Sequence, residues 1–73
     1  MTTRQIIESA RNHVGQAQME SSARLCLADA IRSYDAGDYG AASIRAVASL
    51  RYSVGITSSV YQRALRSACG QEG

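Results

Sequence analysis

Apolar residues recur along most of the chain at intervals of three and four residues, the spacing of one face of an α-helix. Strand-like alternation of apolar and polar residues is absent from the sequence, and no proline interrupts the pattern. The pattern predicts an all-α fold, a small three- to four-helix bundle built on antiparallel helical hairpins. The four expected helices run from about Thr3 to Ala17, Glu20 to Ala36, Tyr39 to Ser53 and Ser58 to Cys69.

The second of these segments has the widest apolar surface. Its apolar residues cover more than one helical face, which predicts that this helix is the central and most buried one. Two opposite-charge pairs lie on its remaining surface at helical spacing, Glu20 with Arg24 and Asp29 with Arg32. The apolar residues are Leu25, Cys26, Leu27, Ala28, Ala30, Ile31 and Tyr34.

Each of the other three segments carries a main apolar stripe. The third stripe is mostly alanine, which buries little area but lets helices approach closely, so we expect close contact with the second helix. Ile44 and Val47 lie on a second side of the third helix. The stripes are Ile6, Ile7, Ala10, Val14 and Ala17 in the first helix, Tyr39, Ala42, Ala46, Leu50 and Val54 in the third, and Val60, Tyr61, Ala64, Leu65 and Ala68 in the fourth.

Glycines and short polar residues predict the helix ends. Gly37 suits the left-handed conformation that ends a helix, and Asp38 suits the cap of the next one. Gly55 interrupts the apolar pattern of the third helix. Gly15 weakens a helix without forbidding it, so the sequence leaves open whether the first two helices are separate. Capping boxes are predicted at Thr2 with Gln5 and at Ser59 with Gln62.

The stretch from Ala30 to Leu50 resembles one unit of a tetratricopeptide-type helical hairpin. The resemblance covers less than a third of the chain, and no second copy appears. Asp29 and Ser33 stand where that family prefers a large apolar residue and an aromatic one. The resemblance implies a two-helix hairpin, which the turn chemistry alone would also give. The matching residues are Ala30, Tyr34, the turn Gly37-Asp38-Tyr39, Ala42 and Leu50.

The residues from Gly55 to Leu65 are similar to the turn and recognition helix of helix-turn-helix DNA-binding domains. In that family, small polar residues at the start of a helix face the bases. The sequence departs from the family spacing by about one residue between Gly55 and Val60, and a cap-rich start to an ordinary helix explains the same residues. The resemblance implies a dimeric DNA-binding regulator that reads bases with Thr57, Ser58, Ser59 and Gln62.

The length of 73 residues indicates a single helical domain, with residues 1–2 and 71–73 frayed at its ends. A core this small often supplies too little stability by itself, so association with a second subunit is a reasonable expectation. Cys26 and Cys69 are expected to be unpaired, because one possible bridge is weak evidence for a disulfide framework. No apolar run approaches the ~18 residues of a membrane span and no signal-peptide pattern is present, so we expect a cytoplasmic protein without a membrane partner.

Charge is distributed unevenly along the chain. All eight basic side chains are arginine, and residues 1–38 hold four of them against five acids. Residues 39–71 hold the other four and no acid. Arginine and tyrosine are favoured at binding hot spots, so we expect a surface on the last two helices that binds a partner. Its candidate residues are Arg45, Arg51, Tyr52, Tyr61, Arg63 and Arg66.

The sequence offers little for catalysis. His13 is the single histidine and has no Asp, Glu or Cys at a metal-ligand spacing, so no metal site is expected. Asp35 and Asp38 flank a turn and are interpreted as caps rather than as an acid–base pair. No glycine-rich phosphate loop is present. We therefore expect a non-enzymatic protein without a cofactor.

These features favour a small helical protein that binds a larger protein or nucleoprotein partner through its arginine and tyrosine surface. The isoelectric point of about 8.8 lies below the value above about 9 that is usual for free nucleic-acid binders. In size and character the chain is similar to small phage and mobile-element proteins that inhibit a host machine, anti-CRISPR proteins among them. The alternatives are the dimeric helix-turn-helix regulator and a structural oligomerisation domain, which would be a homodimer or larger.

Overall fold

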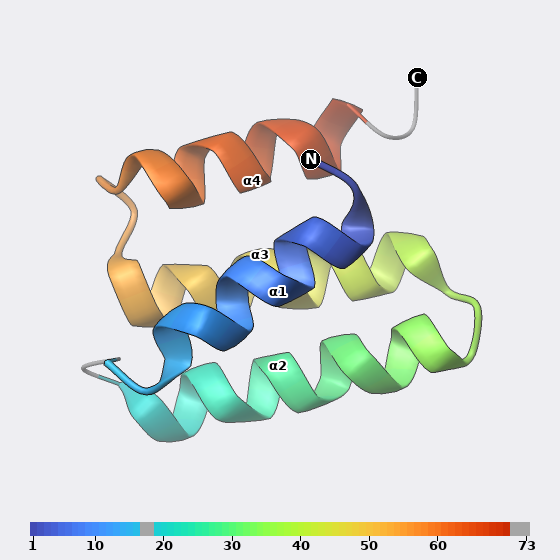
Figure 1. The fold of residues 1–73 in the computed structure, drawn as a ribbon, viewed down its shortest axis with the longest axis horizontal. Coiled ribbons are helices and arrows are strands. Elements are labelled where there is room, and N and C mark those ends of the chain that lie inside the picture. The colour runs from blue at the N-terminus through green and yellow to red at the C-terminus, as the bar shows by residue number, and fades with distance from the viewer. Residues whose placement is uncertain (17–18, 71–73) are drawn as a thin grey trace.

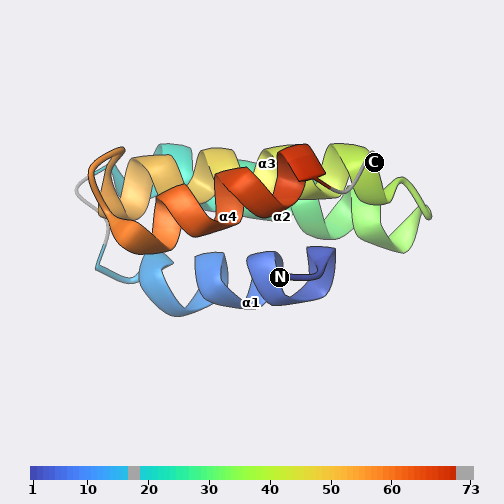
Figure 2. The same cartoon turned by 90° about the horizontal axis from the view of Figure 1, so that it is seen from above.

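The structure is a computed structural model that describes residues 1–16 and 19–70. This part of the chain forms four helices, α1 (Thr3–Val14), α2 (Glu20–Asp35), α3 (Tyr39–Val54) and α4 (Ser59–Gly70). The helices α2, α3 and α4 lie side by side in one layer, each antiparallel to the next (Figure 1). Helix α1 crosses one broad face of this layer (Figure 2). The predicted all-α bundle is confirmed.

Helix α1 begins with the predicted capping box and ends earlier than predicted. The Gln5 N–H donates to Thr2 Oγ1 at 3.2 Å, and the Thr2 N–H donates to Gln5 Oε1 at 2.8 Å. The helix ends at Val14, after which the Gln16 N–H bonds to the His13 carbonyl in a tight turn. The predicted end at Ala17 lies outside the described residues. Since α2 starts at Glu20 and packs against α1, the two are separate helices.

The turn between α2 and α3 forms as its sequence predicts. Gly37 has a φ of 85°, a backbone conformation that costs a residue with a Cβ roughly 1–2 kcal/mol. The Asp38 carboxylate accepts the Ala41 N–H at 3.2 Å and so caps α3. Gly55, with a φ of 88°, follows the last residue of α3. A sharp reversal at each end therefore makes α3 antiparallel to both of its neighbours in the layer.

The start of α4 differs from the predicted capping box. Ser58 acts as the cap, because its Oγ accepts the Val60 N–H at 3.2 Å. Gln62 reaches back with its side-chain amide to the Ile56 carbonyl at 2.6 Å. The predicted cap, Ser59 paired with Gln62, is wrong by one residue. Thr57, Ser58 and Ser59 could each cap a helix, and α4 is capped by Ser58.

Helix α3, and not α2, is the central helix. It packs against all three other helices, whereas α2 packs only against α1 and α3. Leu25 on α2, predicted to be buried, has 69% of its surface exposed, and Ala28 is exposed as well. The buried apolar core comprises Ile6, Ile7, Ala10, Val14, Ala23, Leu27, Ala30, Ala42, Ala46, Val47, Leu50 and Ala64.

Two buried hydroxyl contacts explain why a helix rich in alanine and serine can be central. Ser49 Oγ donates to the Ala23 carbonyl of α2 at 2.8 Å. Ser43 Oγ lies 2.7 Å from Thr3 Oγ1 of α1. Small side chains let the helices approach closely, and each buried serine hydroxyl has a hydrogen-bonding partner on the neighbouring helix. The predicted close packing of the second and third helices is confirmed.

Two apolar residues of α3 lie outside the core, Tyr39 from the predicted main stripe and Ile44 from the second side of the helix. Tyr39 is mostly exposed and packs its ring against Tyr34, with ring centroids 5.0 Å apart. Ile44 has 63% of its surface exposed. Tyr39 lies at the α1 and α2 side of α3, in a hollow that it lines together with Arg4 and Tyr34, whereas Ile44 lies on a surface that neither α1 nor α2 covers.

Candidate functional site

The layer of α2, α3 and α4 has two broad faces, and α1 covers only one of them (Figure 2). We call the other one the open face. On α3, four exposed side chains point toward it in two rows along the helix, because residues seven apart lie almost above one another. One row is Ile44 with Arg51, and the other is Arg45 with Tyr52. The central helix of the bundle thus presents apolar and cationic side chains to solvent together.

An apolar groove lies between α3 and α4 beside the first of these rows. Ile44 forms its wall on α3, and Leu65, with 36% of its surface exposed, forms the wall on α4. Val47 and Ala68 line the floor, and Cys69 stands at one end with a free thiol. The groove has a volume of about 260 Å³. A recess of this kind is suited to one or two apolar side chains of a partner.

Arginines stand on both sides of this groove. Arg51 shares a row with Ile44, and Arg45 lies beside that row on α3. On α4, Arg66 is three residues before Cys69 and two after the buried Ala64, so it projects from the outer edge of the layer beyond the groove. All three side chains are exposed.

No acid compensates these arginines within residues 1–16 and 19–70. The ion pairs of the described chain lie on α1 and α2, and from Tyr39 to Gly70 the sequence has no acidic residue. Arg45, Arg51, Arg63 and Arg66 consequently make no ion pair with any described residue. The pairs are Arg4–Glu8 at 3.6 Å, Arg24–Glu20 at 2.6 Å and Arg32–Asp29 at 3.8 Å, of which the last two match the predicted pairs.

The remaining predicted binding residues are not all on this surface. Tyr61 is partly buried and packs against the core, so most of its ring is used within the fold. Arg63 is exposed, but it lies one turn before Ser67, which accepts a hydrogen bond from the Met1 ammonium at 3.0 Å. That side of α4 faces α1. The structure therefore places Arg45, Arg51 and Tyr52 together on the open face of α3 and Arg66 at the outer edge of α4. It separates Tyr61 and Arg63 from the three α3 residues.

Tyr52 belongs to a second hollow at the end of the layer, where the α3–α4 turn lies. Arg51 and the exposed Ile56 line the same hollow. Sequence reasoning missed the apolar part of the site, since it assigned Leu65 to the apolar stripe of the last helix and gave Ile44, on a second side of the third helix, no part in a site.

Two of the four residues predicted to read DNA bases have other roles here. Ser58 caps α4, and the Gln62 amide is bonded to the Ile56 carbonyl. Thr57 and Ser59 are exposed at the turn. The helices α3 and α4 run side by side and antiparallel (Figure 1), whereas the two helices of a helix-turn-helix cross at about 90–120°. No observation in the described chain favours base reading by these residues.

With this geometry in place, the chain can be compared with known proteins. No protein-family model, curated protein or solved structure matches it significantly. The candidate site is therefore defined by the chain's own geometry.

Two further observations bear on what the chain can do. No group of three His, Cys, Asp or Glu side chains that could hold a metal ion occurs among the described residues. His13, the single histidine, has its Nδ1 2.7 Å from the Ser9 carbonyl one turn earlier, at the edge of the core. None of the described helices is long and apolar enough to cross a lipid bilayer.

Proposed function

We propose that this protein binds an acidic surface of a larger protein through the open face of its helical layer. The groove between α3 and α4 receives an apolar side chain of the partner, and Arg45, Arg51 and Arg66 pair with carboxylates around it. The observation that carries the proposal is the exposed Ile44 beside arginines that have no acid to pair with in the described chain. Apolar anchors combined with arginine are typical of protein interfaces.

The apolar groove favours a protein partner over bare nucleic acid. Phosphates are bound by cationic and polar groups, and an exposed isoleucine adds nothing to such contacts. A protein partner instead buries that side chain, at roughly 25 cal/mol for each Å² removed from water. In a nucleoprotein complex, the protein component would therefore be the one contacted. A protein acting in this way works by covering a functional surface of its partner, as a phage or mobile-element protein that inhibits a host machine would.

The test compares two double variants with the same change in net charge. A partner is first captured from cells with the tagged protein, identified by mass, and purified for calorimetry. We expect Arg51→Gln with Arg66→Gln to weaken this purified complex at least tenfold, about 1.4 kcal/mol, because two carboxylates of the partner lose their counterions. The control is Arg24→Gln with Arg32→Gln on α2, which should leave the affinity within about threefold.

A third variant separates the two classes of partner. Ile44→Ser removes the apolar anchor at an exposed position, so the helical circular-dichroism signal should be retained. Loss of affinity in this variant supports a protein interface with the groove at its centre. The proposed site would be contradicted if the two double arginine variants weakened the complex equally, or if Ile44→Ser bound the partner with the affinity of the wild type.

A further inference from the structure

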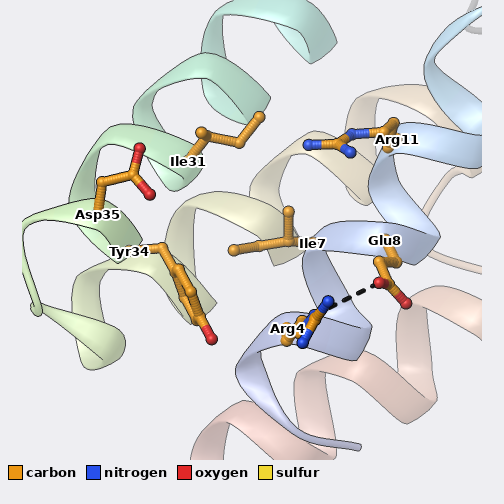
Figure 3. A pocket seen from close by; sticks show the side chains of 7 residues that line it. All are labelled: Arg4, Ile7, Glu8, Arg11, Ile31, Tyr34 and Asp35. Atoms are coloured by element: carbon orange, nitrogen blue, oxygen red, sulfur yellow. Dashed lines mark ion pairs between the residues drawn. The ribbon is translucent and has the colours of Figure 1, made fainter.

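The opposite side of the molecule has a second recess, between α1 and α2 (Figure 3). It has a volume of about 310 Å³, and Ile7 and Ile31 form its apolar lining. Arg11 extends from α1 toward α2 at one side, and Asp35 stands on α2 at the other (Figure 3). Nothing in the proposed function uses this recess, because it lies on the face of the layer that α1 covers.

The recess contains one unpaired charge of each sign. Arg4 and Glu8 on its rim pair with each other at 3.6 Å. Arg11 and Asp35 are both exposed, and neither has an ion-pair or hydrogen-bonding side-chain partner among the described residues. The open face differs in that its unpaired charges are all positive. A partner of the open face must therefore be acidic, whereas a partner of the α1–α2 face must itself present charges of both signs.

A face with unpaired charges of both signs can be complementary to a second copy of itself when the two charges meet across a twofold axis. In a twofold dimer the same surface is used by both subunits, so a residue i that contacts j is matched by j contacting i. Arg11 of one copy can then pair with Asp35 of the other, and the reverse pair forms by symmetry. The open face lacks this property, because a twofold contact there would place arginine against arginine.

Apolar surface beside the recess adds area to such a contact. A neighbouring hollow shares Arg4 and Tyr34 with the recess and is lined by Tyr39 and Met1, two of the exposed large apolar residues of the chain. Tyrosine and methionine are enriched in interface cores. A stable interface buries about 800 Å² on each partner, a large part of one broad face of a molecule measuring 31 × 23 × 14 Å. A small core of this kind also gains stability from a second subunit.

We infer that a second copy of this chain binds the α1–α2 face in a twofold dimer, with Arg11 of each copy paired to Asp35 of the other. The dimer leaves both open faces free, so each copy retains its own proposed binding site. Self-association and partner binding are thus carried by opposite sides of the layer and by different charged residues.

The test measures the molar mass of the full-length protein by sedimentation over a concentration series at low salt. We expect a dimer for the wild type and a shift of at least tenfold in the dissociation constant toward monomer for Arg11→Glu and for Asp35→Arg, because each puts like charges in contact. The double variant carrying both changes should recover the dimer, since the reversed pair is again complementary. Circular dichroism checks that each variant is folded.

The control is Arg51→Gln with Arg66→Gln, which should remain dimeric even though it loses the partner. A wild type that stays monomeric at millimolar concentration would overturn the inference. So would a dimer that both single reversals leave unchanged, or a double variant that remains as weak as the single ones. Because the partner assay reads only the open face, failure of the dimer leaves the proposed function standing, and the converse holds as well.

Discussion

At the scale of single residues, small polar side chains hold the central helix in place. Ser43 and Ser49 are almost fully buried, yet each has a hydrogen-bonding partner on a neighbouring helix. Burying a hydroxyl without a partner costs roughly 1–3 kcal/mol, so these contacts make a serine-containing stripe compatible with a core. They also fix the separation of α3 from α1 and α2, since a larger side chain at either position would force the helices apart.

Ser49→Ala should lower the free energy of unfolding by about 1 kcal/mol, because the bond to the Ala23 carbonyl is lost in a buried site. The measurement is urea denaturation followed by circular dichroism. Ser53→Ala is the matched control, because the Ser53 Oγ donates to the Leu50 carbonyl within the same helix at 3.1 Å. The higher helix propensity of alanine offsets the loss of that bond. Equal destabilisation of the two variants would argue against an inter-helix role for Ser49.

At the scale of elements, turn chemistry was the part of the fold that could be predicted best. Gly37 and Asp38 predicted the reversal between α2 and α3, and Thr2 with Gln5 predicted the start of α1, because each acts through neighbouring backbone groups. The identity of the central helix could not be predicted in this way. Patterns of apolar residues rank Leu25 above Ser49, whereas the packing of three helices around α3 buries the serine and exposes the leucine.

The candidate site was predicted in part. The arginines follow directly from the absence of acids in residues 39–71, which is a property of the sequence. The groove could not be predicted from the sequence, because Ile44 and Leu65 recur at the same helical spacing as residues that are buried. Only the position of α1 in the structure shows which face of the layer is left open. The positions of Tyr61 and Arg63 could not be predicted either, because nearness in sequence gives no information on the side of α4 from which each projects.

Two glycines near the start of α3 should respond oppositely to alanine. Gly37→Ala should lower the melting temperature, because the φ of 85° costs roughly 1–2 kcal/mol with a Cβ present, about 4–8 °C per kcal/mol for a domain of this size. Gly40→Ala should raise it, since Gly40 lies inside the helix and its added Cβ would meet only Asp38 Oδ1, at 4.0 Å. Thermal unfolding of both variants checks the pair. A stabilised Gly37→Ala would show that the turn does not hold this conformation in solution.

At the scale of the whole molecule, the bundle is a three-helix layer that uses its two faces differently. One face is covered by α1 and has unpaired charges of both signs, and the other is open, with unpaired arginines of α3 near its apolar groove. This asymmetry arises from a single feature of the sequence, the confinement of acids to the first half of the chain apart from Glu72. Helix α3 packs against α1 on one face and presents the groove on the other. Its packing in the core must therefore be retained when a partner binds to either face.

Stability should accordingly differ along the chain, with α4 the first helix to open. It packs mainly against α3, makes only a small contact with α1, and contributes Ala64 alone to the fully buried core of the described residues. Helices with few buried apolar contacts open locally at a free energy below that of global unfolding. Amide hydrogen exchange should therefore be fastest in the interior of α4 and slowest in α3, and it should slow in α4 when a partner fills the groove. Uniform exchange across the four helices would instead show that the bundle opens only as a whole, in which case α4 could not adjust to a partner independently of the core.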